Sequence, residues 1–280
     1  MRTVLSALSV LLAVVLAAVA VPALWLDRNV VDESGFVHLL GPMGSDKDIQ
    51  STLVSNLDAA VLSSAGVPDA LKPIAQQAVD AVAKGLVSDP GFPQAWSDTL
   101  RATHQVNFSA DRASANAFEL ELRPLADLLA RKLGASLNAS ISGPPSLTVQ
   151  VGTAQQRSWL TNAQDLARLG IPLAFGAVLA LVLGLLFARR RGVALAWAGL
   201  GLLVVAALFQ GADGLIPAAG SAQGNSGSMS STFGARAAEL AAANFESWIL
   251  ALAVCGAVLL VVGAVLGAVR RRRRRAEASF

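Results

Sequence analysis

Residues Ile171–Phe209 read IPLAFGAVLALVLGLLFARRRGVALAWAGLGLLVVAALF, two apolar runs on either side of three arginines. A membrane-spanning helix needs roughly 18 or more consecutive apolar residues, and each run comes close to that length. Because the connection between them is only a few residues long, the two helices are expected to be antiparallel neighbours. The stretch therefore predicts a transmembrane hairpin and a membrane protein rather than a soluble globular domain.

Four apolar runs in all are predicted to span the membrane: Val4–Leu26, Ile171–Ala188, Val193–Phe209 and Trp248–Val269. None contains Asp, Glu, Lys, Arg or His, and ionisable residues inside spans are the usual mark of ion relays and coupled transport. The sequence thus argues against a pump. A signal peptide is the alternative for the first run, but its apolar character continues to Leu26, which favours an uncleaved anchor.

Positive charge is concentrated beside the spans, although the net charge of the whole chain is only +3. The positive-inside rule places both termini and the turn between the second and third spans on the cytoplasmic side of a bacterial plasma membrane. A nucleic-acid site is the alternative for the six-arginine run, but its position directly at the end of a span favours anionic lipid headgroups. The residues assigned to topology and headgroup contact are Arg189, Arg190, Arg191, Arg270, Arg271, Arg272, Arg273, Arg274 and Arg275.

The predicted fold is mainly α, with four transmembrane helices plus a small, mostly helical extracytoplasmic domain that carries a short β-ribbon. The ribbon is expected from FELEL at Phe118–Leu122 and LTVQV at Leu147–Val151, which alternate apolar and polar residues. The predicted order is an N-terminal anchor at 1–26, the extracytoplasmic domain at 27–169, a transmembrane hairpin at 170–210, a flexible extracytoplasmic loop at 211–247, the fourth transmembrane helix at 248–269 and a basic cytoplasmic tail at 270–280.

Small residues recur at helical spacing on two of the spans. In lipid, faces of small residues let helix backbones approach closely, and this packing drives association. We therefore expect a compact four-helix bundle with close contacts at Gly176, Ala180, Gly184, Gly256, Gly263 and Gly267.

The sequence offers little chemistry. It contains no HExxH, CxxC, GxSxG or GKS/T motif, and the single cysteine, Cys255, lies inside the last span. His38 and His104 have Asp32 and Asp98 nearby in the chain, but proximity in sequence is weak support for an acid–base pair. We therefore predict no catalytic residue, no cofactor and no metal site.

One helix of the outer domain carries an apolar stripe with a residue every four positions. This pattern is typical of an inner helix face, so His104 is expected to be a hydrogen-bonded core histidine rather than a functional one. The predicted outer-domain core residues are Phe92, Trp96, Leu100, His104 and Phe108.

Phe92, Trp96 and His104 also form a Phe-x3-Trp-x7-His pattern, which is followed by FELELRPLADLL, PPSLTVQV and AQQRSWLTNAQDLARL. In this order the elements resemble uncharacterised actinobacterial integral membrane proteins with an extracytoplasmic helical domain. Glu121 stands where those proteins usually have Asp. The resemblance spans roughly residues 40 to 200 and implies an envelope-facing membrane protein with no assigned enzyme activity.

Three functions follow as hypotheses. The first is a non-enzymatic accessory or scaffold protein of an actinobacterial cell-envelope complex, with membrane lipids and a membrane or envelope protein as partners and no nucleic acid. The second is a receptor-like binding module for an envelope lipid or glycan, with an apolar cleft lined by Phe92, Trp96 and Phe108. The third is an envelope hydrolase that uses His104, which requires that residue to reach a solvent-exposed cleft beside a carboxylate.

Overall fold

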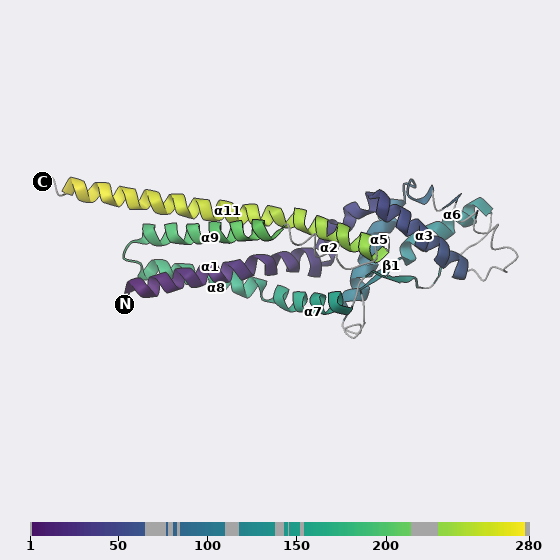
Figure 1. Ribbon diagram of the computed structural model, residues 1–280, viewed down its shortest axis with the longest axis horizontal. Coiled ribbons are helices and arrows are strands. Elements are labelled where there is room, and N and C mark those ends of the chain that lie inside the picture. Colours follow the sequence, from purple (N-terminus) through teal and green to yellow (C-terminus); the bar gives the residue numbers. More distant parts are fainter. Residues whose placement is uncertain are drawn as a thin grey trace. The chain divides into compact units, whose positions relative to one another are not determined.

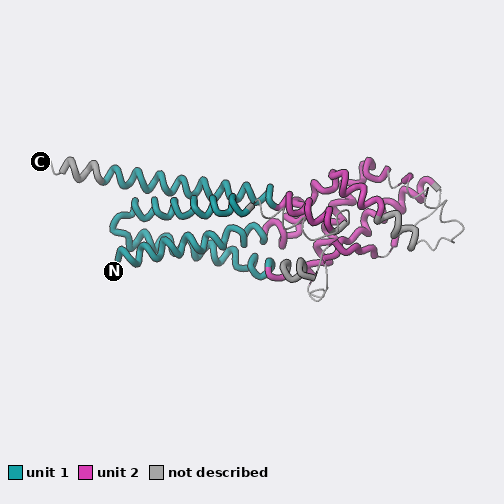
Figure 2. Tube along the Cα trace, in the orientation of Figure 1, with its two compact units in different colours: residues 1–27, 163–216, 242–280 teal, residues 28–162, 217–241 magenta. Residues whose placement is uncertain are grey.

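The computed structural model describes residues 2–64, 77, 81–82, 85–109, 118–137, 143–144, 146–151, 154–213 and 229–277. These residues are mainly α-helical, with one two-stranded sheet (Figure 1). The chain divides into two compact units (Figure 2): unit 1 is Met1–Asp27, Ala163–Ile216 and Ala242–Phe280, and unit 2 is Arg28–Asn162 and Pro217–Ala241. The prediction of a mainly α fold with a short β-ribbon is confirmed.

Unit 1 is built from long apolar helices, which lie side by side in Figure 1. They are α1 (Arg2–Leu26), α8 (Gly170–Phe187), α9 (Arg191–Asp213) and the part of α11 (Met229–Glu277) that follows Ala241. The segments long and apolar enough to cross a membrane are Arg2–Val31, Thr161–Phe187, Arg191–Ala212 and Ser231–Arg270.

The surface of unit 1 is as apolar as its sequence. Among the described residues, the large hydrophobic side chains that are exposed all belong to unit 1; Phe175 and Trp197, for example, are 74% and 64% exposed. Contiguous apolar surface of this kind marks a membrane or interaction site, because soluble monomers rarely expose it. The lengths of the helices and their surface together indicate a membrane protein.

Unit 2 contains short helices: α2 (Glu33–Leu40), a 3-10 turn (Gly41–Ser45), α3 (Lys47–Ser64), α5 (Phe92–Phe108) and α6 (Arg123–Leu137). Aspartates cap the first turns of two of them, α2 and α3. The Asp32 carboxylate accepts the Gly35 N–H at 2.8 Å, and the Asp46 carboxylate accepts two N–H groups at the start of α3 at 3.0 and 3.2 Å. Such side chains satisfy N–H groups that have no partner within the helix.

Buried apolar side chains join the described helices of unit 2 to its sheet. Strands β1 (Glu119–Glu121) and β2 (Thr148–Gln150) pair antiparallel, with Leu120 opposite Val149. Leu120 is fully buried, so one face of this ribbon covers the core. The other large, fully buried apolar side chains are Met43, Ile49, Leu53, Leu86, Leu100, Leu122, Leu125 and Leu129.

The prediction of a flexible loop at 211–247 is wrong over its second part, because α11 begins at Met229. Residues 214–228 of that loop lie outside the described residues. The helix is explained by the run of alanines after the Gly/Ser-rich stretch, since alanine has the highest helix propensity. Phe233 is buried, and the Arg236 guanidinium pairs with the Asp46 carboxylate at 3.1 Å, so this part of α11 belongs to unit 2.

The predicted boundaries of the last span and of the outer domain also need adjustment. The helix expected at 248–269 is the middle of α11, which extends beyond both ends. Helix α7 (Ala154–Arg168), expected to belong to the outer domain, is divided: its residues from Ala163 onward group with unit 1.

Candidate functional site

The side chains predicted as the outer-domain core all lie along α5. Phe92, Trp96, Leu100 and His104 are buried, with exposed fractions of 5%, 2%, 0% and 8%, and Phe108 is partly exposed. The Trp96 indole N–H donates to the Gly41 carbonyl at 3.1 Å. Two of the three rings that the receptor hypothesis expected to line a cleft, Phe92 and Trp96, are therefore packed inside unit 2.

His104 is held by a backbone group and by aromatic rings. Its Nε2 lies 2.9 Å from the Val31 carbonyl oxygen, and because that oxygen can only accept, Nε2 carries a proton. The imidazole stacks on Phe108 with ring centroids 4.2 Å apart, and Phe36 lies 5.3 Å away. The suggested partner, Asp98, instead accepts hydrogen bonds from Gln94 and Arg101. His104 and Asp98 thus have separate hydrogen-bond partners, and no hydrogen bond joins them as an acid–base pair.

A polar stripe on α5, which the sequence analysis missed, binds the free edge of β1. The Asn107 amide donates to the Glu119 carbonyl at 2.6 Å and accepts the Glu119 N–H at 3.1 Å. The Thr103 hydroxyl accepts the Glu121 N–H at 3.0 Å. A two-stranded ribbon alone is marginal, so these side chains take the place of a third strand. Their signal was the four-residue spacing of Thr99, Thr103 and Asn107.

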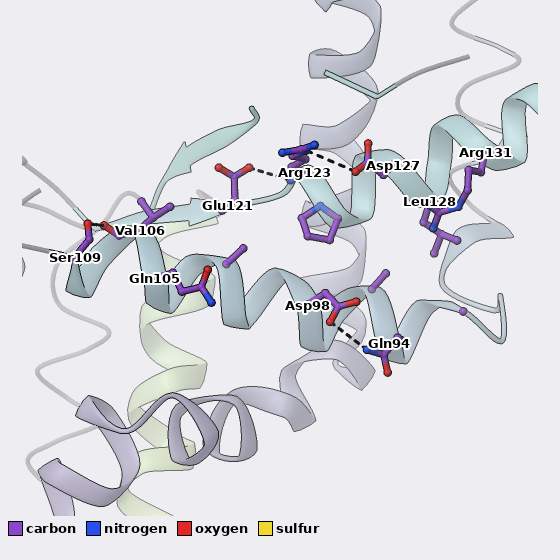
Figure 3. A pocket seen from close by; sticks show the side chains of 14 residues that line it. Gln94, Asp98, Gln105, Val106, Ser109, Glu121, Arg123, Asp127, Leu128 and Arg131 are labelled. Atoms are coloured by element: carbon purple, nitrogen blue, oxygen red, sulfur yellow. Dashed lines mark hydrogen bonds and ion pairs between the residues drawn. The ribbon is translucent and has the colours of Figure 1, made fainter. Parts of the chain in front are cut away.

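A solvent-open groove of about 810 Å³ lies between α5 and α6 (Figure 3). We call it the α5/α6 groove. Small or apolar residues such as Ala95, Ala102 and Leu128 contribute to its lining. Its charged and amide side chains are Gln94, Asp98, Gln105, Glu121, Arg123, Asp127 and Arg131.

The charges of the groove alternate along α6 and are partly paired. Arg123, Asp127 and Arg131 follow one another at four-residue spacing, and the Arg123 guanidinium lies 3.7 Å from the Asp127 carboxylate. Glu121 uses one carboxylate oxygen to accept the N–H groups of Arg123 and Leu147, each at 3.1 Å, which ties the start of α6 to the chain before β2. An open groove with both signs of charge suits a protein segment of mixed charge better than an apolar ligand.

An ion pair holds the two walls of the groove together. Asp89, just before α5, accepts the Gly91 N–H at 2.7 Å and forms an ion pair with Lys132 of α6. The hydrogen bond from Lys132, and after it the one from Gly91, hold the pKa of the Asp89 carboxyl below its ordinary value. The carboxylate is thus ionised in the folded unit at neutral pH, and it fixes the end of the groove.

The small residues predicted on the second span lie against α1. A Cβ atom added at Gly184 would lie 3.0 Å from a methyl group of Val10, and one added at Gly176 would lie 3.3 Å from Leu16. Ala180, between them on α8, is buried. The Ser6 hydroxyl donates to the Gly184 carbonyl at 2.7 Å, which adds an interhelical hydrogen bond beside this close contact.

Glycines of the fourth span pack against glycines of α9 that the sequence analysis missed. Gly256 faces Gly199, and Gly263 faces Gly192: a Cβ atom at Gly263 would lie 2.5 Å from the Gly192 carbonyl oxygen. Within α9, Gly192 and Gly199 are seven residues apart, and within α11, Gly256 and Gly263 are also seven residues apart. This equal spacing in two antiparallel helices could have indicated the match. Gly267 differs, since a Cβ atom there would have no neighbour within 4 Å among the described residues.

Arg270 lies near the arginines of the turn between α8 and α9, at one end of unit 1. Arg189, Arg190 and Arg191 are exposed where α8 turns into α9, and Arg270 near the end of α11 is also exposed. Arg189 and Arg190 share one cavity lining with Thr3 at the start of α1 and another with Arg270. The side chains of Arg271, Arg272, Arg273, Arg274 and Arg275 lie outside the described ones.

Comparison of the chain with protein-family models, with curated proteins and with solved structures finds no match. The resemblance to actinobacterial membrane proteins therefore stays a prediction. Within the residues that the structure describes, no three His, Cys, Asp or Glu side chains gather into a group that could hold a metal ion.

Proposed function

We propose that the chain is a non-enzymatic integral membrane accessory or scaffold protein of an actinobacterial cell-envelope complex, and that unit 2 faces the envelope and contacts a protein partner. The observation that carries this proposal is the α5/α6 groove, which is open to solvent and bears both signs of charge. Charged walls of this kind select a partner by electrostatic complementarity and exclude partners with like charges in register.

The bundle supports a scaffold role because its contacts favour a fixed arrangement. Backbone-to-backbone approaches at Gly192, Gly199, Gly256 and Gly263 leave no room for side-chain adjustment. Closely packed helices without a bistable element hold their arrangement rather than switch it. In this role the spans anchor the chain in the membrane, and unit 2 supplies the specificity.

Three polar side chains of α5 that lie outside the groove are engaged in structure, which favours the groove as the surface for recognition. His104 binds the Val31 carbonyl, and Thr103 and Asn107 bind β1. The hydrolase hypothesis required His104 in an open cleft beside a carboxylate, and the buried ring gives it no support.

The test is site-specific photo-cross-linking in the native membrane. A photoreactive residue at Gln94, in the groove, should give one discrete cross-linked protein at near-stoichiometric yield, and the same residue at Ser51 on α3, outside the groove, should not. Arg131→Glu in the groove should abolish the product, and Lys47→Glu, an exposed charge reversal on α3, should leave it unchanged. Equal cross-linking from Gln94 and Ser51, or a product that survives Arg131→Glu, would overturn the proposal.

A further inference from the structure

Two apolar grooves run along α9 within unit 1, one on each side of the exposed Trp197. The first lies between α1 and α9 and has a volume of about 820 Å³; the second lies between α9 and α11 and has a volume of about 500 Å³. Val193, Trp197 and Leu200 line both grooves, so these three side chains form the ridge between them. We call them the α1/α9 groove and the α9/α11 groove.

The same two arginines stand at the mouth of both grooves. Arg189 and Arg190 line each of them, and Arg270 also lines the α9/α11 groove. All three side chains are exposed, and no acidic side chain among the described residues pairs with them. A guanidinium presents a fork of donors that matches the oxygen atoms of a phosphate. The mouth is thus positively charged, whereas the walls below it are apolar.

The depth of the grooves matches one leaflet of a bilayer. From Arg190 the α1/α9 groove reaches Val205, which at 1.5 Å per residue is about 22 Å of helix, and the α9/α11 groove reaches Leu200, about 15 Å. Half of the hydrocarbon core is about 15 Å thick. Near its deep end the α1/α9 groove is closed by contact of α1 with α9, since a Cβ atom at Gly201 would lie 2.7 Å from Val14.

We propose that these grooves hold one anionic phospholipid, with its phosphate on Arg189 and Arg190 and one acyl chain on each side of Trp197. Two chains that diverge from one headgroup match two grooves that diverge from one pair of arginines. A free phosphate ion would leave both apolar grooves unfilled. A zwitterionic lipid would fill them, but its cationic group would offset the attraction to the arginines. This site depends on unit 1 alone and not on the function proposed for unit 2.

The first test is native mass spectrometry of the full chain in mild detergent, titrated with phosphatidylglycerol and with phosphatidylcholine of the same chains. A basic residue near the surface changes affinity for anionic lipid about fivefold, so the change Arg189→Gln/Arg190→Gln should weaken phosphatidylglycerol binding about thirtyfold. Arg191→Gln is the matched control, because Arg191 belongs to the same turn but lines neither groove. It should weaken binding less than fivefold.

The second test fills the grooves without changing charge. Ala194 lines only the α1/α9 groove and Ala264 only the α9/α11 groove, whereas Ala257 is exposed on α11 and lines neither. Ala194→Phe and Ala264→Phe should each reduce binding of both lipids at least fivefold, and Ala257→Phe should not.

Three results would overturn the proposal. These are equal retention of the two lipids by the unchanged protein, undiminished phosphatidylglycerol binding when Arg189 and Arg190 are both Gln, and loss of bound phosphatidylglycerol to inorganic phosphate at similar concentration. The last result would show a phosphate site that makes no use of the grooves. The unfolding midpoint of every variant is measured as well, to separate loss of lipid binding from loss of folding. Because the substituted arginines and Ala257 are exposed, their variants should keep the midpoint of the unchanged protein.

Discussion

Replacing Gly263 by Ala should force α9 and α11 apart. The added Cβ atom would lie 2.5 Å from the Ala196 nitrogen and 2.5 Å from the Gly192 carbonyl oxygen, whereas ordinary contact begins at 3.4 Å. The helices must therefore separate locally by about 0.9 Å. Both obstacles are backbone atoms, so no side-chain rotation relieves the clash. Overpacking of this kind typically costs about 1–3 kcal/mol.

Gly267→Ala is the matched control, one turn further along the same helix. A Cβ atom there meets nothing within 4 Å among the described residues. Both changes replace glycine by alanine inside α11, so the gain in helix propensity, up to about 1 kcal/mol, is common to the two variants. The difference between them isolates the clash, and we expect Gly263→Ala to be less stable than Gly267→Ala by about 1–3 kcal/mol.

The assay is reversible unfolding of the full chain in mixed micelles with increasing denaturing detergent, which yields a free energy of unfolding for each variant. A double-mutant cycle adds a second check. Gly192→Ala acts at the same contact and should combine with Gly263→Ala less than additively, because one separation of the helices accommodates both methyl groups. Gly184→Ala acts between α8 and α1 and should be additive. If Gly263→Ala is as stable as Gly267→Ala, the proposed close approach of α9 and α11 is refuted.

Three further predictions concern unit 2 and can be measured on the full chain. Thr99→Val should leave stability unchanged or raise it, because the buried Thr99 hydroxyl has no hydrogen-bond partner in the described structure. Thr103→Val should instead cost about 1–3 kcal/mol, because it leaves the Glu121 N–H unpaired. Hydrogen exchange of the β1 amides measures both effects. His104→Ala should cost about 2–4 kcal/mol through a cavity and a lost hydrogen bond, seen as faster exchange along α5. Because the pKa of Asp89 is lowered, the ionised carboxylate stabilises the folded state at pH values above the ordinary pKa of 3.8, and this stabilisation is lost as the pH falls below 3.8. The unfolding midpoint should therefore drop in this acid range, and it should drop less steeply in Asp89→Asn.

Each of these predictions has an outcome that contradicts it. Equal exchange of β1 in Thr99→Val and Thr103→Val would show that the Thr103 hydroxyl does not hold the strand. Unchanged hydrogen exchange along α5 in His104→Ala would contradict the packed environment of the imidazole. For the acid transition, a midpoint that falls as steeply in Asp89→Asn as in the unchanged chain would assign the pH dependence to other carboxyl groups, of which Asp32, with its own lowered pKa, is the first to examine.

The class of fold was predictable because long apolar runs have few alternative structures and the arginines divide them clearly. The two strands of the ribbon were likewise readable from alternation, which is set by the geometry of a strand. Contacts between helices were harder to predict. Gly192 and Gly199 gain their meaning only when α9 is known to lie against α11, and spacing within one helix does not name the neighbour.

Two other misses have a local cause. The start of α11 at Met229 was hidden because a Gly/Ser-rich stretch precedes an alanine-rich one, and a single composition was assigned to both. The roles of Thr103 and Asn107 were missed because polar residues on a helix are usually solvated. Their burial depends on a strand that comes later in the chain and that the sequence alone does not bring to α5.

The binding of β1 by Asn107 has a consequence for how other chains can associate with this protein. An unpaired strand edge is a template on which a foreign strand can add, either as a recognised peptide or as the first step of aggregation. Here the Glu119 N–H and carbonyl on that edge are already bound by one side-chain amide. A foreign strand can extend the ribbon at β1 only by displacing both Asn107 and Thr103. Loss of the Asn107 amide, by substitution or by deamidation, would remove part of this protection against strand addition, and Thr103 would keep the rest.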